Sequence, residues 1–399
     1  MRCWPLVALL ITLAVVACGH PAAVTGVDSV DTVAEPVEDT VPRRSITFVL
    51  GSDHSLYNQY YTMASHYYRL DRTDRTEAVV DGLTSLSQVI DYLNRHPDTL
   101  RFRPYGLVNL VSHGNEFIDL SATVVPRGAR VSAASIRAAL ADSLLPALDS
   151  GIVDERTVVF LHGCAVGQNQ PLLDAVALAF GGRAVVKASK LFEYYAYLSP
   201  NHNPQSIRHY YARTWYAFYH PDSVAGEESL VAQLRGRYPG EEVDWSAGLR
   251  CRFQNNPSEL YHYDFIVPCR YTEYYASPDE KPAVNTRARR QQWVDNHADF
   301  QGLLDSTRIP RRFFQTKFYR VSATGVDGQR YTGLEVRARA GVICLIQPLV
   351  ATDTTGVEYM PFRPAADDTA IFAWSKRVEK SVVPPLRLPV LFPEVPFRM

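Results

Sequence analysis

The sequence lacks an excess of either charge. Its 399 residues include 41 lysines and arginines and 42 aspartates and glutamates, so the formal net charge is −1 at pH 7. Proteins that bind nucleic acid concentrate lysine and arginine in a basic stripe. No such stripe runs along this chain, so nucleic acid is not an expected partner. After the first 20 residues the chain also lacks a long apolar run, and we expect the remainder to be soluble.

Cysteine is scarce, and common metal-binding patterns are missing. The chain has six cysteines and neither a C-x-x-C nor an H-E-x-x-H pattern. Because a zinc site needs three or four ligands, we predict no metal and no cofactor, and interpret His162 as a packing or pocket-wall residue. Cys344 lies in the run V-I-C-L-I, which is typical of a core strand. Cys251 and Cys269 form either a disulfide, in an oxidising compartment, or two free thiols.

Residues 1–17 have the layout of a secretory signal. Arg2 precedes an apolar run over residues 6–16, which is too short to span a bilayer. The following V-V-A-C resembles the bacterial lipobox, in which the cysteine, here Cys18, becomes the lipidated first residue of the mature lipoprotein. The resemblance implies a palmitate-bearing anchor on a membrane surface, and Gly19 resembles outer-membrane sorting in Gram-negative bacteria. The alternative is an ordinary signal cleaved nearby, with Cys18 incidental.

Beyond the signal, three segments differ in composition. Residues 18–44 lack aromatic residues and helical periodicity, and this composition predicts a flexible acidic tether. In residues 45–243 strand and helix patterns alternate, which predicts an α/β fold with a mainly parallel sheet flanked by helices. Residues 244–399 predict a β-rich domain with a proline-rich extended tail from residue 382. The helices predicted in the last two segments are 56–70, 83–95, 132–148, 171–180, 206–219, 227–237 and 286–304.

Two of the predicted buried strands end on residues that suit catalysis. The run L-V-N-L-V-S-H-G contains His113, and the run T-V-V-F-L-H-G-C contains Cys164. Short apolar runs bounded by glycine are typical of strands buried on both faces. In an open α/β sheet such strands present their C-terminal residues to the ligand crevice. We therefore expect His113 and Cys164 to lie side by side, with the imidazole able to take the proton of the thiol.

This pattern resembles the caspase-like fold of the clan CD cysteine peptidases. His113 and Cys164 are 51 residues apart, and roughly 50 residues separate the histidine and the cysteine of caspases. The resemblance covers about half of the chain and departs from the caspase Q-A-C-x-G pattern, since this sequence has H-G-C-A-V-G. It implies a distant branch in which the backbone N–H groups of Gly114 and Cys164 form the oxyanion hole.

The resemblance also implies positions for substrate recognition. Related enzymes place a charged pocket residue after the first strand, where Asp53 stands, and a further pocket wall after the nucleophile strand, which leads here to Ser189 and Glu193. Two acids there would favour a basic side chain in the substrate, whereas ordinary surface carboxylates are the alternative. We expect Glu116 to be an exposed acid.

The expected function is that of a membrane-tethered cysteine endopeptidase that cleaves peptide or protein substrates. One alternative is a catalytically silent caspase-like binding module. Another is a cysteine hydrolase or transpeptidase that acts on envelope substrates, because a membrane tether fits that role nearly as well.

Overall fold

The computed structural model divides the chain into two units, Met1–Val41 and Pro42–Met399, of which the second contains the described residues. These are residues 43–53, 59–70, 76–96, 102–197, 207–223, 225–252, 260–324, 328–349, 351–352, 358–359, 365 and 368–376. The predicted signal, the lipidation site Cys18 and the proline-rich tail lie outside them. Within the described ranges, no helix is both long and apolar enough to cross a bilayer.

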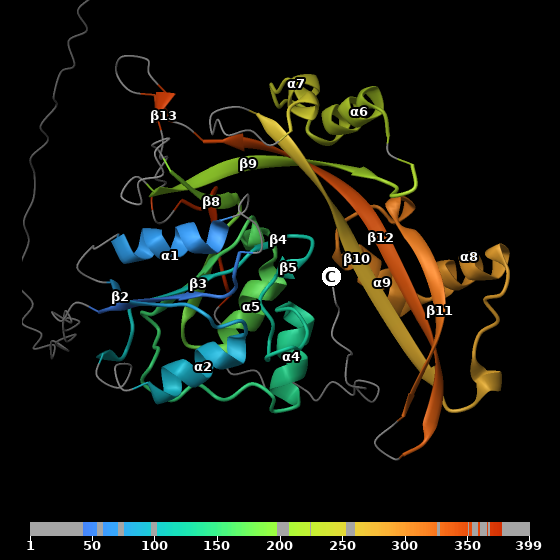
Figure 1. Ribbon diagram of the computed structural model, residues 1–399, viewed down its shortest axis with the longest axis horizontal. Helices are drawn as coiled ribbons and strands as arrows, with labels where there is room; N and C mark the ends of the chain where they lie inside the picture. Colours follow the sequence, from blue (N-terminus) through green and yellow to red (C-terminus); the bar gives the residue numbers. More distant parts are fainter. Residues whose placement is uncertain are drawn as a thin grey trace, which may run out of the picture. The chain divides into compact units, whose positions relative to one another are not determined.

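The first sheet, in which Figure 1 labels β2 and β3, has six described strands in the order β15-β7-β6-β3-β1-β2. The strands are β1 (Ser45–Val49), β2 (Thr76–Val80), β3 (Leu107–Val111), β6 (Val158–His162), β7 (Val185–Ser189) and β15 (Phe372–Trp374). All neighbours are parallel except β15, which runs antiparallel to β7. The predicted α/β fold with a mainly parallel sheet is therefore confirmed.

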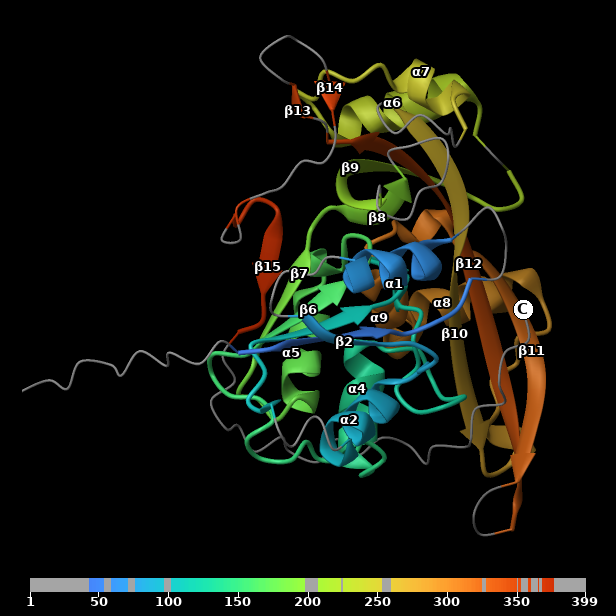
Figure 2. The same cartoon turned by 60° about the vertical axis from the view of Figure 1, so that its left-hand side comes forward.

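Helices cover both faces of this sheet, which is why its strands are apolar runs without alternation. Helix α1 (Tyr60–Leu70) lies on one face, and α2 (Leu86–Arg95), α4 (Ala133–Ala141) and α5 (Gln170–Ala179) lie on the other (Figure 2). The three last-named helices and the strands facing them share one apolar core. Helix α4 ends seven residues before the predicted limit at residue 148.

Helix α2 shows how the sequence determines one of these elements. Its N-cap, Ser85, accepts a hydrogen bond from the backbone of Gln88, and the Gln88 side chain accepts one in return from the N-cap backbone. This capping box satisfies two N–H groups that a helix start otherwise leaves unpaired. The predicted apolar positions Leu86, Val89, Ile90 and Leu93 are all buried, as helical spacing requires.

A second, antiparallel sheet packs long strands in the order β10-β12-β9-β8, with β11 paired to β12. Its strands are β8 (Phe192–Tyr197), β9 (Ile207–Tyr219), β10 (Tyr261–Tyr275), β11 (Gln315–Thr324) and β12 (Arg330–Pro348). Five long strands agree with the prediction of a β-rich segment, although β8 and β9 precede residue 244. Cys344 is fully buried in β12, as predicted for a core strand.

The prediction of a helix over residues 206–219 was wrong, because the described part of this segment is strand β9. Tyr216 and Phe218 of β9 belong to the core on one face, whereas Trp215, Ala217 and Tyr219 pack into a separate cluster on the other. A strand covered on both faces reads as a continuous apolar run, which periodicity alone does not distinguish from a buried helix.

The antiparallel sheet therefore takes strands from both sides of residue 243, where we predicted a domain boundary. β8 and β9 precede that position and β10 to β12 follow it. In the opposite direction, β15 from the C-terminal part of the chain completes the first sheet. The sheets are built from interleaved parts of the sequence.

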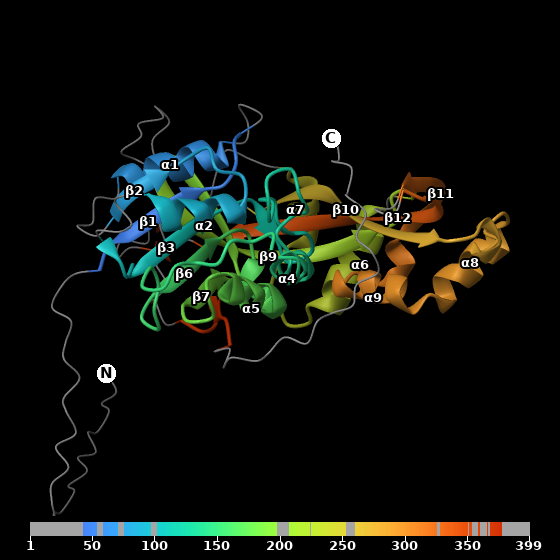
Figure 3. The same cartoon turned by 90° about the horizontal axis from the view of Figure 1, so that it is seen from below.

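The remaining described elements are short. Helices α6 (Glu227–Arg237) and α7 (Trp245–Arg250) contact the antiparallel sheet, and α8 (Arg287–Asn296) and α9 (Ala298–Ser306) lie near its other end (Figure 3). We predicted one helix where α8 and α9 stand; His297 separates them, caps α9 and ends α8. Minor elements are β4 (Gly114–Asn115), β5 (Asp119–Leu120), β13 (Ala351–Thr352), β14 (Glu358–Tyr359), and the 3-10 turns η1 (Val166–Gln168), η3 (Pro278–Glu280) and η4 (Arg311–Phe313).

Candidate active site

The two strands that carry His113 and Cys164 are neighbours in the first sheet. β3 and β6 pair in parallel, and Val111 stands opposite His162 at the end of the ladder. The N–H of Ser112 donates to the carbonyl oxygen of His162 at 2.9 Å, which extends the pairing by one step. His113 and Cys164 each follow two residues after the last pair, so they leave the sheet at equivalent positions. Adjacent strands are about 4.8 Å apart, and the side-by-side placement predicted from the sequence therefore agrees with the register.

Aromatic side chains of helix α1 hold His113. The Tyr60 ring stacks on the imidazole with centroids 4.4 Å apart, and the Tyr61 ring meets it edge-on at 4.8 Å. The backbone N–H of His113 donates to the hydroxyl of Tyr61 at 3.1 Å. Burial lowers the pKa of His113, and the negative charge of Asp53 opposes this only in part. The imidazole is therefore neutral at pH 7 and able to accept a proton.

The Cys164 thiol is partly exposed and also uncharged at rest. Its Sγ donates a hydrogen bond to the carbonyl oxygen of Glu193 at 3.3 Å. Burial, with a smaller contribution from the charges of Glu193 and Glu116, raises the pKa of Cys164 to about 12. A thiol beside a neutral imidazole becomes nucleophilic when the imidazole removes its proton during the attack.

The backbone around the nucleophile is tightly constrained. A Cβ atom at residue 163 would lie 3.0 Å from the carbonyl oxygen of Ser112, so Gly163 allows the two chains to approach. Ala165 adopts a left-handed conformation, with φ 54° and ψ 16°, while its N–H donates to the carbonyl oxygen of Leu191. Such a conformation is unfavourable for a residue with a Cβ atom, and strained residues of this kind gather at functional sites. The sequence analysis did not identify Ala165.

Gly114 has a structural requirement of its own. It forms the short β4–β5 hairpin with Leu120, and a Cβ atom there would lie 2.5 Å from the carbonyl oxygen of Asp119. Only glycine fits at this position. The residue that the resemblance implicates in the oxyanion hole is thus fixed by the fold beside His113.

The predicted substrate-pocket residues have other roles in the structure. Asp53 accepts hydrogen bonds from the N–H groups of Tyr61 and Thr62 at 3.1 and 2.9 Å, and so caps the first turn of α1. The Ser189 hydroxyl is part of a tight turn, where it donates to the Leu191 carbonyl oxygen and accepts the N–H of Leu191. Ser189 and Glu193 are fully buried. The prediction that these two residues line a substrate pocket is therefore wrong.

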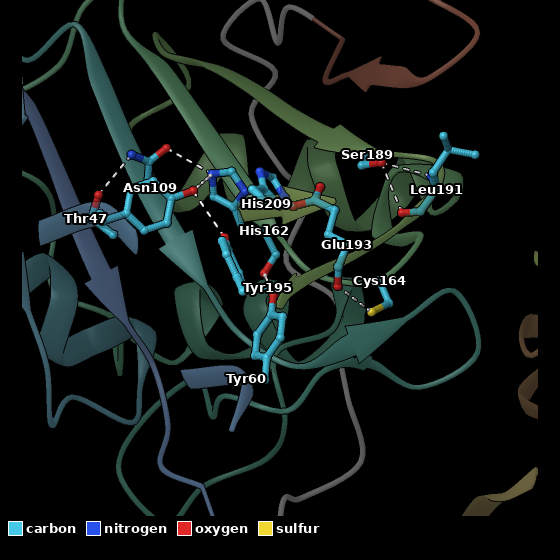
Figure 4. Close-up of polar contacts among 11 residues, drawn as sticks. Thr47, Tyr60, Asn109, His162, Cys164, Ser189, Leu191, Glu193, Tyr195 and His209 are labelled. Carbon is cyan, nitrogen blue, oxygen red and sulfur yellow. Dashed lines mark hydrogen bonds and ion pairs between the residues drawn. The ribbon is translucent and has the colours of Figure 1, made fainter. Parts of the chain in front are cut away.

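Glu193 belongs instead to a buried polar cluster next to Cys164 (Figure 4). Its Oε2 atom accepts from Nδ1 of His162 at 2.9 Å and from Nε2 of His209 at 3.1 Å. On its other side His162 faces Asn109 and Tyr68. His162 is buried, as expected of a packing residue, but it is also part of this network. The sequence analysis missed Asn109 and His209, although Asn109 interrupts the buried run L-V-N-L-V, where a polar residue signals a specific partner.

Glu116 is buried, contrary to the prediction that it is exposed. Its exposed fraction is 5%, and its Oε2 atom lacks a hydrogen-bond partner among the described residues. Burial raises the pKa of Glu116 to about 7, although a hydrogen bond with Tyr216 lowers it. Next to it, Phe117 packs edge-on against Tyr216 at 4.8 Å. Glu116 therefore changes charge near neutral pH within reach of the Cys164 thiol.

Cys251 and Cys269 are not joined by a disulfide, so the bridge that we considered does not form. The carbonyl oxygen of Cys251 accepts the N–H of His262, and Cys269 follows seven residues later on β10. At about 3.3 Å per residue this is a separation of roughly 23 Å along the strand. A disulfide requires Cα atoms only about 4–7 Å apart.

Comparisons with known proteins do not extend this picture. No protein-family model matches the sequence, no curated protein is similar to it at a significant level, and no solved structure matches the fold. The chemistry of the site therefore has to be judged from its own residues.

Proposed function

We propose that this protein is a caspase-like cysteine peptidase in which Cys164 is the nucleophile and His113 the base. The observation that supports this most is the equivalent position of the two residues after the adjacent parallel strands β3 and β6. A sheet of mainly parallel strands covered by helices on both faces is compatible with the resemblance. The neutral states of thiol and imidazole suit a nucleophile that is activated by a neighbouring base.

The reaction proposed for this pair conserves every proton. The His113 imidazole takes the Cys164 proton as Sγ attacks the carbonyl carbon of the scissile peptide. The oxyanion accepts hydrogen bonds from backbone N–H groups, which the resemblance assigns to Gly114 and Cys164; each such donor is worth roughly 3–4 kcal/mol. The imidazolium then protonates the leaving amine, and water, deprotonated by His113, hydrolyses the thioester to release the acid and restore the thiol.

The cellular setting belongs to the same proposal. V-V-A-C after a short apolar run supports a lipid anchor on Cys18 and an exported, membrane-tethered enzyme of the cell envelope, with the outer membrane indicated by Gly19. Its partner is then a peptide or protein substrate at that surface. Expression in a lipoprotein-competent host with radiolabelled palmitate tests the anchor: wild type incorporates label and Cys18→Ser does not. Unlabelled wild-type protein would refute it.

An activity-based probe tests the peptidase assignment directly. An acyloxymethyl-ketone peptide alkylates a nucleophilic cysteine that its base can activate, so wild type should be labelled and Cys164→Ala should not. Cys251→Ala is the matched control, because Cys251 is also partly exposed but lies away from the strand ends and should leave labelling unchanged. Equal labelling of Cys164→Ala, or an unlabelled wild type, would favour a binding module without catalytic activity.

A further inference from the structure

Three side chains from three strands converge within the structure (Figure 4). His162 on β6, Glu193 on β8 and His209 on β9 each present one potential ligand atom, and these atoms all lie within 4.8 Å of one another. Glu193 Oε2 is 2.9 Å from Nδ1 of His162 and 3.1 Å from Nε2 of His209. Ligand atoms around a tetrahedral zinc ion are about 3.3 Å apart, because the bonds are about 2.0–2.2 Å long. The two pairs that involve Glu193 are therefore already near the spacing of a metal's ligand shell, and the two histidine nitrogens lie within 4.8 Å of each other.

Hydrogen-bonding groups on its far side hold the His162 ring in one orientation. Nε2 lies 3.1 Å from Oδ1 of Asn109, whose Nδ2 donates to Oγ1 of Thr47 at 3.0 Å. The Tyr68 hydroxyl lies 2.9 Å from the same Nε2 atom. Nδ1 therefore faces the Glu193 carboxylate, 2.9 Å from Oε2. A metal ion that binds Nδ1 and Oε2 releases the proton that they share.

The burial of the cluster favours the metal ion. Glu193 is fully buried, and its Oε1 atom has no hydrogen-bond partner in the described part of the chain. A buried carboxylate requires a counter-charge. The nearby Lys187 ammonium lies over the Phe372 ring, 3.9 Å from its centroid.

We propose that His162, Glu193 and His209 bind one divalent transition-metal ion, for which zinc is the best match. Two imidazoles and one carboxylate form a ligand set suited to zinc and to iron(II). The Thr47–Asn109–His162 chain supplies the outer hydrogen bond that orients a ligating histidine. The sequence analysis predicted no metal because these ligands, from three strands, form no local motif.

The place of the site in the fold indicates a structural role. His162 belongs to the first sheet, whereas Glu193 and His209 belong to the antiparallel sheet. A metal ion between them joins the two sheets at one point. The carbonyl oxygen of Glu193 also accepts the hydrogen bond of the Cys164 thiol, so the same ion fixes the backbone beside the candidate nucleophile. Metal binding itself does not depend on the proposed peptidase activity.

Metal stoichiometry of the full chain tests the proposal. The protein is stripped with a chelator, loaded with zinc chloride, desalted and analysed by mass spectrometry of the elements. We expect about one zinc ion per chain, a higher melting temperature than in the stripped protein, and loss of both in Glu193→Gln and His209→Asn. Cobalt(II) loading should give visible d–d bands without a thiolate charge-transfer band, because the ligands are nitrogen and oxygen.

Controls separate this site from accidental binding. His220→Ala removes a histidine from the turn after β9, and Cys164→Ala removes the nearest thiol in sequence; both should retain the zinc. His209 is the most exposed of the three ligands, with 10% of its side chain accessible, so His209→Asn is the variant least prone to misfold. The proposal would be overturned if wild type retained less than about a tenth of an equivalent of zinc. It would also be overturned if wild type bound one equivalent of zinc and His209→Asn and Glu193→Gln bound the same amount. The first result would identify the cluster as a hydrogen-bonded network of the two histidines and Glu193 without a metal ion.

Discussion

Two polar sites lie at the end of strand β6, two residues apart, and they differ in their exposure to solvent. Cys164, beyond its end, is partly exposed and is matched across the sheet by His113. His162, its last residue, is buried and bound to Glu193. Both sites combine a histidine with a second titratable group, but only the group beyond the strand end is partly exposed. The comparison indicates that position along the strand, more than residue type, separates the proposed reactive pair from a buried structural one.

The largest effect is expected at the exposed site. Cys164→Ala and His113→Ala should each reduce peptide turnover by roughly 10³-fold or more, because nucleophile and base act as one unit. The melting temperature should change little for Cys164→Ala, since that thiol is partly exposed. Hydrolysis of a fluorogenic peptide library by the purified proteins provides the measurement. A double variant should be no slower than either single one, and peptidase activity retained in His113→Ala would remove this residue from the mechanism.

At the buried site the loss should appear in stability. Glu193→Gln removes the charge that both histidines face, and breaking a buried pair typically costs about 3–5 kcal/mol of unfolding free energy. Urea denaturation followed by circular dichroism measures this difference. Glu155→Gln is the matched control, because Glu155 pairs with Arg183 on the surface and should leave the unfolding free energy nearly unchanged. Equal, small effects in both variants would show that the cluster contributes no stability.

Glu116 combines features of both sites, because it is buried and its charge raises the pKa of the Cys164 thiol. Its pKa is about 7 in the folded protein and 4.5 for the ordinary group, so the folded state holds the proton more tightly. Stability contributed by the protonated carboxyl is complete below pH 4.5 and is lost as the pH rises to about 7. This loss amounts to about 3 kcal/mol, at 1.36 kcal/mol per pKa unit.

Glu116→Gln should abolish that part of the pH dependence. The unfolding free energy of each protein is measured in urea at pH 5 and at pH 8. Between these two pH values it should fall by about 3 kcal/mol more in wild type than in the variant. The pKa of the Cys164 thiol should also decrease, which iodoacetamide alkylation across a pH series would detect. Parallel stability profiles for the two proteins would show that Glu116 remains ionised throughout.

The parts of this structure that were predictable depend on local patterns. Buried strands bounded by glycine, and helices with apolar spacing and caps such as Ser85, are specified by a few adjacent residues. The strand patterns also placed His113 and Cys164 after two buried strands, and these strands are neighbours in the sheet. These inferences required no knowledge of distant contacts.

The failures have a common physical cause, which is pairing between distant segments. Residues 207–219 form a strand because they pair with β8 on one edge and with β12 on the other, which their own periodicity does not reveal. Glu193 and Ser189 were assigned to a pocket from the resemblance to clan CD peptidases, yet both are fully buried. His209 could not be associated with His162 before β8 and β9 were placed beside the first sheet. A site assembled across two sheets leaves no sequence motif.

Asp53 provides the smallest and last test, because it lies at the border between structural and catalytic roles. Its carboxylate caps α1, whose Tyr60 and Tyr61 hold the His113 ring, and Asp53→Ala should therefore cost about 1 kcal/mol of unfolding free energy. Removing its charge should also lower the pKa of His113 further, so the acidic limb of the activity profile should move to lower pH. Asp91→Ala, an exposed acid on α2, is the control for both measurements. A selective loss of cleavage after basic residues, with stability unchanged, would instead return Asp53 to the substrate pocket.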